Sequence, residues 1–134
     1  MKHVPVSILL ILILGLPAVQ TVTGEESPIS LPKSEGSKSF DLEISTANEN
    51  GIRLFELGNF DAARENFSKA VAIAQQFRDP GLGVVSFNLG LTLHKLELHE
   101  STIKAFATAK KYARGNRLIL DSRLIRFHEC GFIH

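Results

Sequence analysis

The residues best suited to chemistry lie near the C-terminal end of the chain. The single cysteine, Cys130, stands between His128 and His134. Thiolate sulfur and imidazole nitrogen both bind Zn²⁺, and the i, i+4 spacing of Cys130 and His134 places them on one face of a helix. His128 lies off that face, whereas a stable zinc site needs three or four ligands. The fold would have to supply His94 and His99 as well, so we expect no bound metal.

No other pattern in the sequence indicates catalysis. Serine, histidine and acidic residues occur, but none lies in a nucleophile elbow or a recognisable triad motif. The Gly-Leu-Gly at residues 81–83 is interpreted as a helix start and not as a phosphate-binding loop. We therefore expect no catalytic residues and no cofactor. The formal net charge of +1 gives no reason to expect a nucleic-acid partner.

The first 24 residues have the pattern of a secretory signal peptide. Lys2 precedes the apolar run Val6–Leu16, which is short for a bilayer span of about 20 residues and typical of a signal-peptide core. Small residues allow cleavage after Ala18 or after Gly24. The alternative is an uncleaved membrane anchor extending to Val22. In either case we expect an exported protein, periplasmic or secreted, with a membrane contact only if this segment is retained.

Residues 25–39 are predicted to form a flexible linker, because the stretch is rich in Ser and Pro and has no apolar period. The folded domain is predicted to span residues 40–134. A single cysteine cannot form an internal disulfide, so packing alone must stabilise this domain.

The domain has the spacing of consecutive α-helices, since apolar residues recur at three- and four-residue steps. We expect five helices, beginning near residues 39–41, 60, 80, 99 and 118. Gly58 and Asn59 form one turn, in which Gly58 can take the left-handed conformation and Asn59 can cap the next helix. Asp79 is the expected cap of the third helix, with Pro80 at its first position. Short turns of this kind require neighbouring helices to pack as antiparallel hairpins.

Two of these hairpins match each other. Like residues recur 39 positions apart, namely Gly51 and Gly90, Phe67 and Phe106, and Ala70 and Ala109. Self-similarity at such a period indicates a stacked helical repeat.

The repeat resembles the tetratricopeptide (TPR) family, whose pattern is W-x2-L-G-x2-Y, then A-x3-F, then P. The first hairpin contains Ala47-x2-Asn50-Gly51-x2-Leu54, then Ala63-x3-Phe67, then Ala70. The second contains Ser86-x2-Leu89-Gly90-x2-Leu93, then Thr102-x3-Phe106, then Ala109. The longer period is similar to the extended variant of about 40 residues per repeat. The resemblance implies an all-α solenoid of two hairpins and a truncated third, following the signal peptide and linker.

The truncated third repeat is Phe127-x2-Cys130-Gly131-x2-His134, which places Cys130 at a buried position of a helix. Apolar residues of this helix are expected to pack on the second hairpin, leaving the other side as an exposed apolar patch. Self-association through this end is therefore possible. The residues expected to pack on the second hairpin are Leu124, Phe127, Phe132 and Ile133.

The resemblance also implies protein–protein binding in a concave groove lined by the first helix of each hairpin. The residues expected to face this groove are Asn48, Ile52, Phe55, Phe87, Asn88, Leu91, His94 and Lys95. Phe55 and Phe87 have a second interpretation, in which they pack between hairpins. The mixed apolar and amide surface suits an amphipathic helix or an extended apolar peptide. The alternative function is an extracytoplasmic sensor or input fragment of a larger TPR-containing signalling protein.

Overall fold

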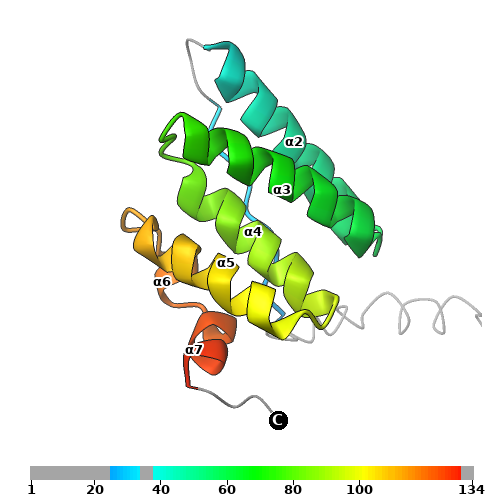
Figure 1. Cartoon of the computed structure of the whole chain (residues 1–134), viewed down its shortest axis with the longest axis vertical. Helices are drawn as coiled ribbons and strands as arrows, with labels where there is room; N and C mark the ends of the chain where they lie inside the picture. The colour runs from blue at the N-terminus through cyan, green and yellow to red at the C-terminus, as the bar shows by residue number, and fades with distance from the viewer. Residues whose placement is uncertain (1–24, 34–37, 131–134) are drawn as a thin grey trace, which may run out of the picture.

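The computed structural model describes residues 25–33 and 38–130. Within these ranges the chain forms six α-helices and no strand (Figure 1), which confirms the all-α fold. The helices are α2 (Ser39–Glu56), α3 (Phe60–Gln76), α4 (Leu82–Lys95), α5 (His99–Lys111), α6 (Arg117–Leu120) and α7 (Arg123–Glu129). The predicted signal peptide lies outside the described residues. Among the helices described, none is both long and apolar enough to cross a membrane.

The first four helices form two hairpins stacked side by side. Helix α2 packs against α3 and α4 packs against α5, while α3 also packs against α4 and joins the hairpins (Figure 1). The first turn is as predicted: Gly58 has a φ of 76°, and the Asn59 side chain accepts a hydrogen bond from the Ala62 N–H at 3.3 Å. The sequence therefore predicted both the hairpins and the first turn between their helices correctly.

Each hairpin is closed by a glycine that faces a phenylalanine ring. A Cβ placed on Gly51 would lie 2.6 Å from the Phe67 ring, and one placed on Gly90 would collide with the Phe106 ring. Both rings are buried, with exposed fractions of 0% and 2%. The 39-residue repeat of the sequence is thus a repeat of one packing contact, in which the absent side chain makes room for the ring.

The start of the third helix differs from the prediction. Helix α4 begins at Leu82, two residues after Pro80, and the Asp79 carboxylate accepts a hydrogen bond from the Gly81 N–H at 2.7 Å. Arg78 takes a left-handed conformation with a φ of 52°. Asp79 therefore stabilises a tight turn on its own downstream backbone, which delays the helix by two residues.

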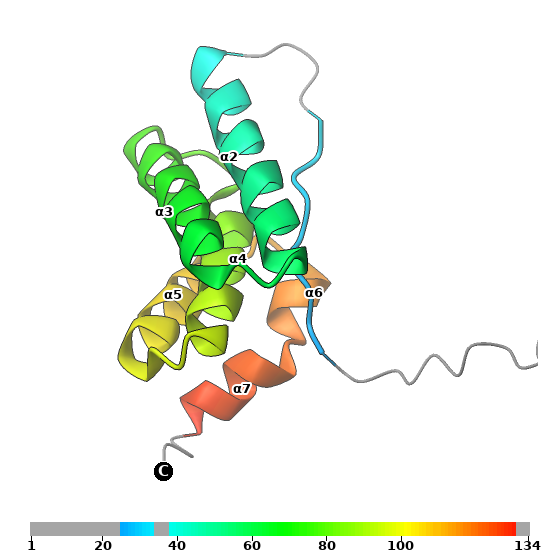
Figure 2. The same cartoon turned by 90° about the vertical axis from the view of Figure 1, so that its right-hand side faces the viewer.

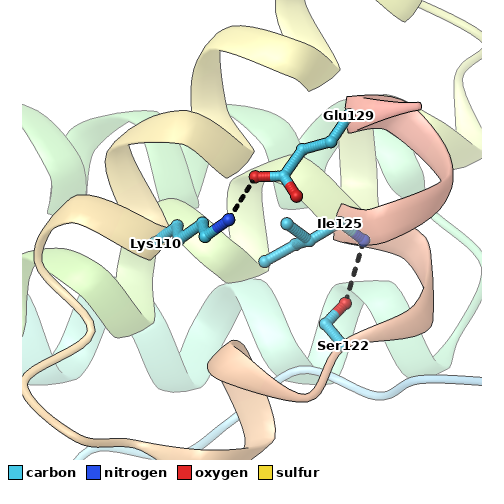
Figure 3. Close-up of polar contacts among 4 residues, drawn as sticks. All are labelled: Lys110, Ser122, Ile125 and Glu129. Atoms are coloured by element: carbon cyan, nitrogen blue, oxygen red, sulfur yellow. Dashed lines mark hydrogen bonds and ion pairs between the residues drawn. The ribbon is translucent and has the colours of Figure 1, made fainter. Parts of the chain in front are cut away.

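The predicted fifth helix is divided into α6 and α7. The Ser122 hydroxyl accepts a hydrogen bond from the Ile125 N–H at 3.1 Å and so starts a new helix (Figure 3). This second start sets a different buried face: Ile125 and His128 point inward, whereas Cys130 is exposed at the helix end. The prediction that Cys130 is buried was therefore wrong. The salt bridge between Lys110 and Glu129, at 2.6 Å, ties α7 to α5 (Figure 3).

The rest of the predicted third repeat, Gly131 to His134, lies outside the described residues. The same is true of Phe132 and Ile133, two of the four residues expected to pack on the second hairpin.

The contact between Gly90 and the Phe106 ring predicts how a substitution should change the stability of the fold. Gly90→Ala should lower the free energy of unfolding by about 1–3 kcal/mol, because the added methyl group overpacks the hairpin against Phe106. Phe106→Leu in the same background should recover part of the loss, which urea denaturation of the two single variants and the double variant would measure as a coupling free energy. Strict additivity of the two changes would contradict the contact.

Candidate functional site

Residues 25–33 lie in an extended conformation along the groove that the sequence placed on the first helices of the hairpins. Figure 2 shows this segment passing beside α2 and on toward α6 and α7. It contains neither helix nor strand, as the predicted linker would, but hydrogen bonds connect it to α2, α4 and α7. The chain's own N-terminal segment thus lies against α2 and α4, the helices that were expected to line the groove.

Two buried amides hold the main chain of one residue in this segment. The Ile29 N–H donates to Asn88 Oδ1 at 2.7 Å, and Asn88 Nδ2 donates back to the Ile29 carbonyl at 2.8 Å. Asn48 Nδ2 donates to the same carbonyl at 3.1 Å, and the two amides are joined by a 2.8 Å bond from Asn88 Nδ2 to Asn48 Oδ1. Both asparagines are 0% exposed. The pair therefore binds the backbone N–H and C=O of Ile29, and these hydrogen bonds do not depend on the side chain of that residue.

The two acidic residues at the start of the segment contact a lysine and two main-chain N–H groups. The Glu25 carboxylate contacts Lys95 Nζ at 2.5 Å, and this hydrogen bond and charge lower the pKa of Glu25. The Glu26 carboxylate accepts hydrogen bonds from the N–H groups of Arg123 and Leu124, at 3.2 and 2.9 Å. The acidic start of the segment thus connects α4 of the second hairpin to the first turn of α7.

Two apolar side chains of the segment complete the contacts. Ile29 packs against the core cluster that contains Phe87 and Leu91, and Leu31 packs against the cluster that contains Ile44. Open space remains at both ends. A pocket of about 100 Å³ lies under the acidic pair, and a larger depression of about 450 Å³ lies beside Leu31.

The structure divides the eight predicted groove residues into three groups. Asn48, Asn88 and Lys95 contact the segment directly. Phe87 and Leu91 are buried beneath it, and Phe87 packs on the Phe106 ring at a centroid distance of 5.9 Å. The remaining three are half-buried, namely Ile52, Phe55 and His94.

Both Phe55 and His94 line the smaller pocket. Phe55 also packs edge-on against Phe60 at 5.1 Å, so one ring both lines the pocket and packs on the next helix.

Sequence reasoning missed the residues that occupy the groove: Glu25, Glu26, Ile29 and Leu31. A signal was present, since two adjacent acids and two alternating apolar residues interrupt an otherwise small and polar stretch. The stretch was predicted to be a linker because it is rich in Ser and Pro and its apolar residues show no helical period.

A histidine pair lies next to this site. His94 Nδ1 is 3.1 Å from His128 Nε2, and His128 is buried on the inner face of α7. Burial lowers the pKa of both imidazoles; the charges of Lys95 and His99 add to this at His94, where Glu26 opposes them. At His128 the neighbouring His94 and His99 add to the effect of burial. Both rings are thus held in the neutral form near pH 7.

The residues considered as metal ligands are partly brought together. His94, His99 and His128 are neighbours, with ring centroids of His99 and His128 6.3 Å apart. Cys130 is exposed at the end of α7, and His134 lies outside the described residues. Within residues 25–33 and 38–130, no three His, Cys, Asp or Glu side chains are arranged to hold a metal ion.

No protein-family model, curated protein or solved structure matches this chain. Its relation to the TPR family is therefore a proposal that depends on its own residues and packing.

The histidine pair predicts how the free energy of unfolding should depend on pH. In the unfolded chain both imidazoles titrate near the ordinary value of 6.5, and in the folded chain their pKa values are lower. Between these values the unfolded chain binds more protons, so the free energy of unfolding should fall as the pH decreases below about 6.5. Urea denaturation at pH 7.5 and 5.5 would measure this loss. His128→Gln should reduce it, whereas His99→Gln, which changes an exposed ring, should leave most of it; equal pH dependence in all three proteins would contradict the assignment.

Proposed function

We propose that this protein is an exported interaction module that binds an extended peptide in the groove along α2 and α4, without catalysis. The stacked hairpins and the TPR-like motif residues support this, since arrays of this kind present the first helix of each hairpin to partners. The observation that carries the proposal is the buried amide pair, Asn48 and Asn88, which is bonded to the main chain of Ile29.

Buried amides favour an extended occupant over a helical one. An unpaired amide in such a position costs about 1–3 kcal/mol, so both side chains need partners when the groove is covered. In a helix the backbone N–H and C=O groups already bond to each other. An extended peptide leaves both groups of every residue free, and Asn88 can bond both groups of one residue at once. Of the two occupants that the sequence allowed, the peptide is the one we propose.

The groove assignment is tested by panning a displayed library of random nonapeptides on the full chain. Selected peptides should bind the wild-type chain and lose at least about tenfold in affinity on Asn88→Leu, because a leucine of similar size offers no hydrogen bonds to their main chain. Asn66→Ala is the matched control, since the Asn66 amide bonds only within α3, to the Ala62 carbonyl.

Melting curves establish that each variant is folded before binding is compared. Peptides that bind Asn88→Leu as well as wild type, or no enrichment at all, would rule out this groove as a peptide site.

Export is tested separately. The leader pattern supports cleavage after Ala18 or Gly24, so N-terminal sequencing of the protein from the extracytoplasmic fraction should begin at residue 19 or 25. An intact Met1 on membrane-bound protein would support the uncleaved anchor instead.

A further inference from the structure

The segment that covers the groove has the features of a ligand. Its contacts come from three separate places: Lys95 on α4 holds Glu25, the first turn of α7 holds Glu26, and the amide pair holds Ile29. Ile29 and Leu31 are two residues apart, a spacing that turns both side chains to the same side of an extended chain. Each meets a different core cluster. Over the seven residues 25–31, the charged groups, the main chain and the apolar side chains thus each have a complementary partner in the folded domain.

The contacts of the two acids are weak enough to be exchanged. The Glu25 side chain is 70% exposed in its pair with Lys95, and exposed ion pairs contribute little to stability. Glu26 is held by two main-chain N–H groups and no cation among its hydrogen bonds. The amide pair and the two apolar contacts hold the segment, and its covalent connection favours it over a free peptide: only residues 34–37 separate it from Lys38, at the start of α2. Such a short connection gives an effective concentration on the order of millimolar.

We propose that residues 25–31 are a built-in competitor, and that the partner of this groove is a peptide of the same chemistry. Such a peptide is extended, with two adjacent carboxylates followed three and five residues after the second by apolar side chains, as in Glu-Glu-x-x-Ile-x-Leu. A partner segment binds when it displaces the chain's own segment from Lys95, the α7 backbone and the amide pair. This inference rests on the proposed function and names both the partner class and the regulation of the same groove.

Positive charge on the groove wall agrees with an acidic partner. Lys95 lies at one end of the amide pair, and the pocket of about 100 Å³ beneath the acids is lined by Lys95 and His94 from α4. Protonation of His94 would add a second positive charge there. The acidic end of the partner and the histidine pair therefore share one region of the surface.

The test uses the full chain and a fluorescent peptide with the sequence of residues 25–33, measured by fluorescence anisotropy. In the double variant Glu26→Ala/Ile29→Gly the chain's own segment loses one carboxylate and one apolar side chain, while every groove residue on α2 and α4 is unchanged. The peptide should bind this variant at least about tenfold more tightly than wild type, because the internal competitor is weakened. Ser27→Ala/Ser30→Ala alters two exposed residues of the same segment and should bind as wild type does.

Two further measurements identify the contacts. Adding Asn88→Leu to the double variant should remove the gain in affinity. A peptide with Ile29→Pro should not bind, because it lacks the N–H that donates to Asn88 Oδ1.

Size-exclusion chromatography with light scattering should find the wild type and the double variant both monomeric. A wild-type dimer that dissociates in the double variant would mean that a second copy's segment fills the groove, which would overturn the proposal.

Equal affinity of the peptide for wild type and double variant, or no binding to either, would also overturn it. If library peptides nevertheless bind in an Asn88-dependent way, the proposed function stands and only the identity of the partner is wrong. If both experiments fail, the groove is not a peptide site.

Discussion

A buried amide must find hydrogen-bond partners, and in this protein that requirement organises the site. Asn48 and Asn88 are fully buried, yet neither has its partners within its own helix. They bond to each other and to the main chain of Ile29. Because the segment that covers them excludes water, its main chain must supply the hydrogen bonds that the two amides do not make to each other, and leaving those groups unpaired would cost about as much as a lost hydrogen bond. The position of the N-terminal segment therefore follows from the two asparagines.

The amides can meet only because the hairpins pack closely. Asn48 is on α2 and Asn88 on α4, one in each hairpin, and α3 packs against α4 between them. The closeness within each hairpin depends on a glycine that leaves room for a phenylalanine ring. A Cβ on Gly51 or Gly90 would collide with the Phe67 or Phe106 ring, so these glycines set how closely the two helices of each hairpin approach. The repeat thus places the first helices of the two hairpins, α2 and α4, next to each other.

The C-terminal helices connect this groove to a second region of the molecule. Helix α7 offers its first N–H groups to Glu26 and buries His128 against His94, which is next to Lys95. The acid-binding end of the groove and the histidine pair consequently share neighbours. A change of protonation at the pair acts on the same helix whose N–H groups hold Glu26, and it changes the stability of the fold there.

The sequence by itself determined the local features. Helical spacing, the Gly58–Asn59 turn and the 39-residue repeat were all visible, because each depends on residues close in the chain or on a pattern that repeats along it. It also named Asn48 and Asn88, the two asparagines that contact the N-terminal segment from α2 and α4. What only the tertiary structure decided was the occupant of the groove, since an extended segment has no period and its contacts lie up to 98 residues away.

The same reason explains the error at Cys130. A motif match fixed its register, but the Ser122 cap began a new helix and turned His128 inward in place of Cys130. Helices reveal themselves through local spacing, whereas an extended strand of chain and the buried face of a short helix are fixed by partners that only the fold supplies.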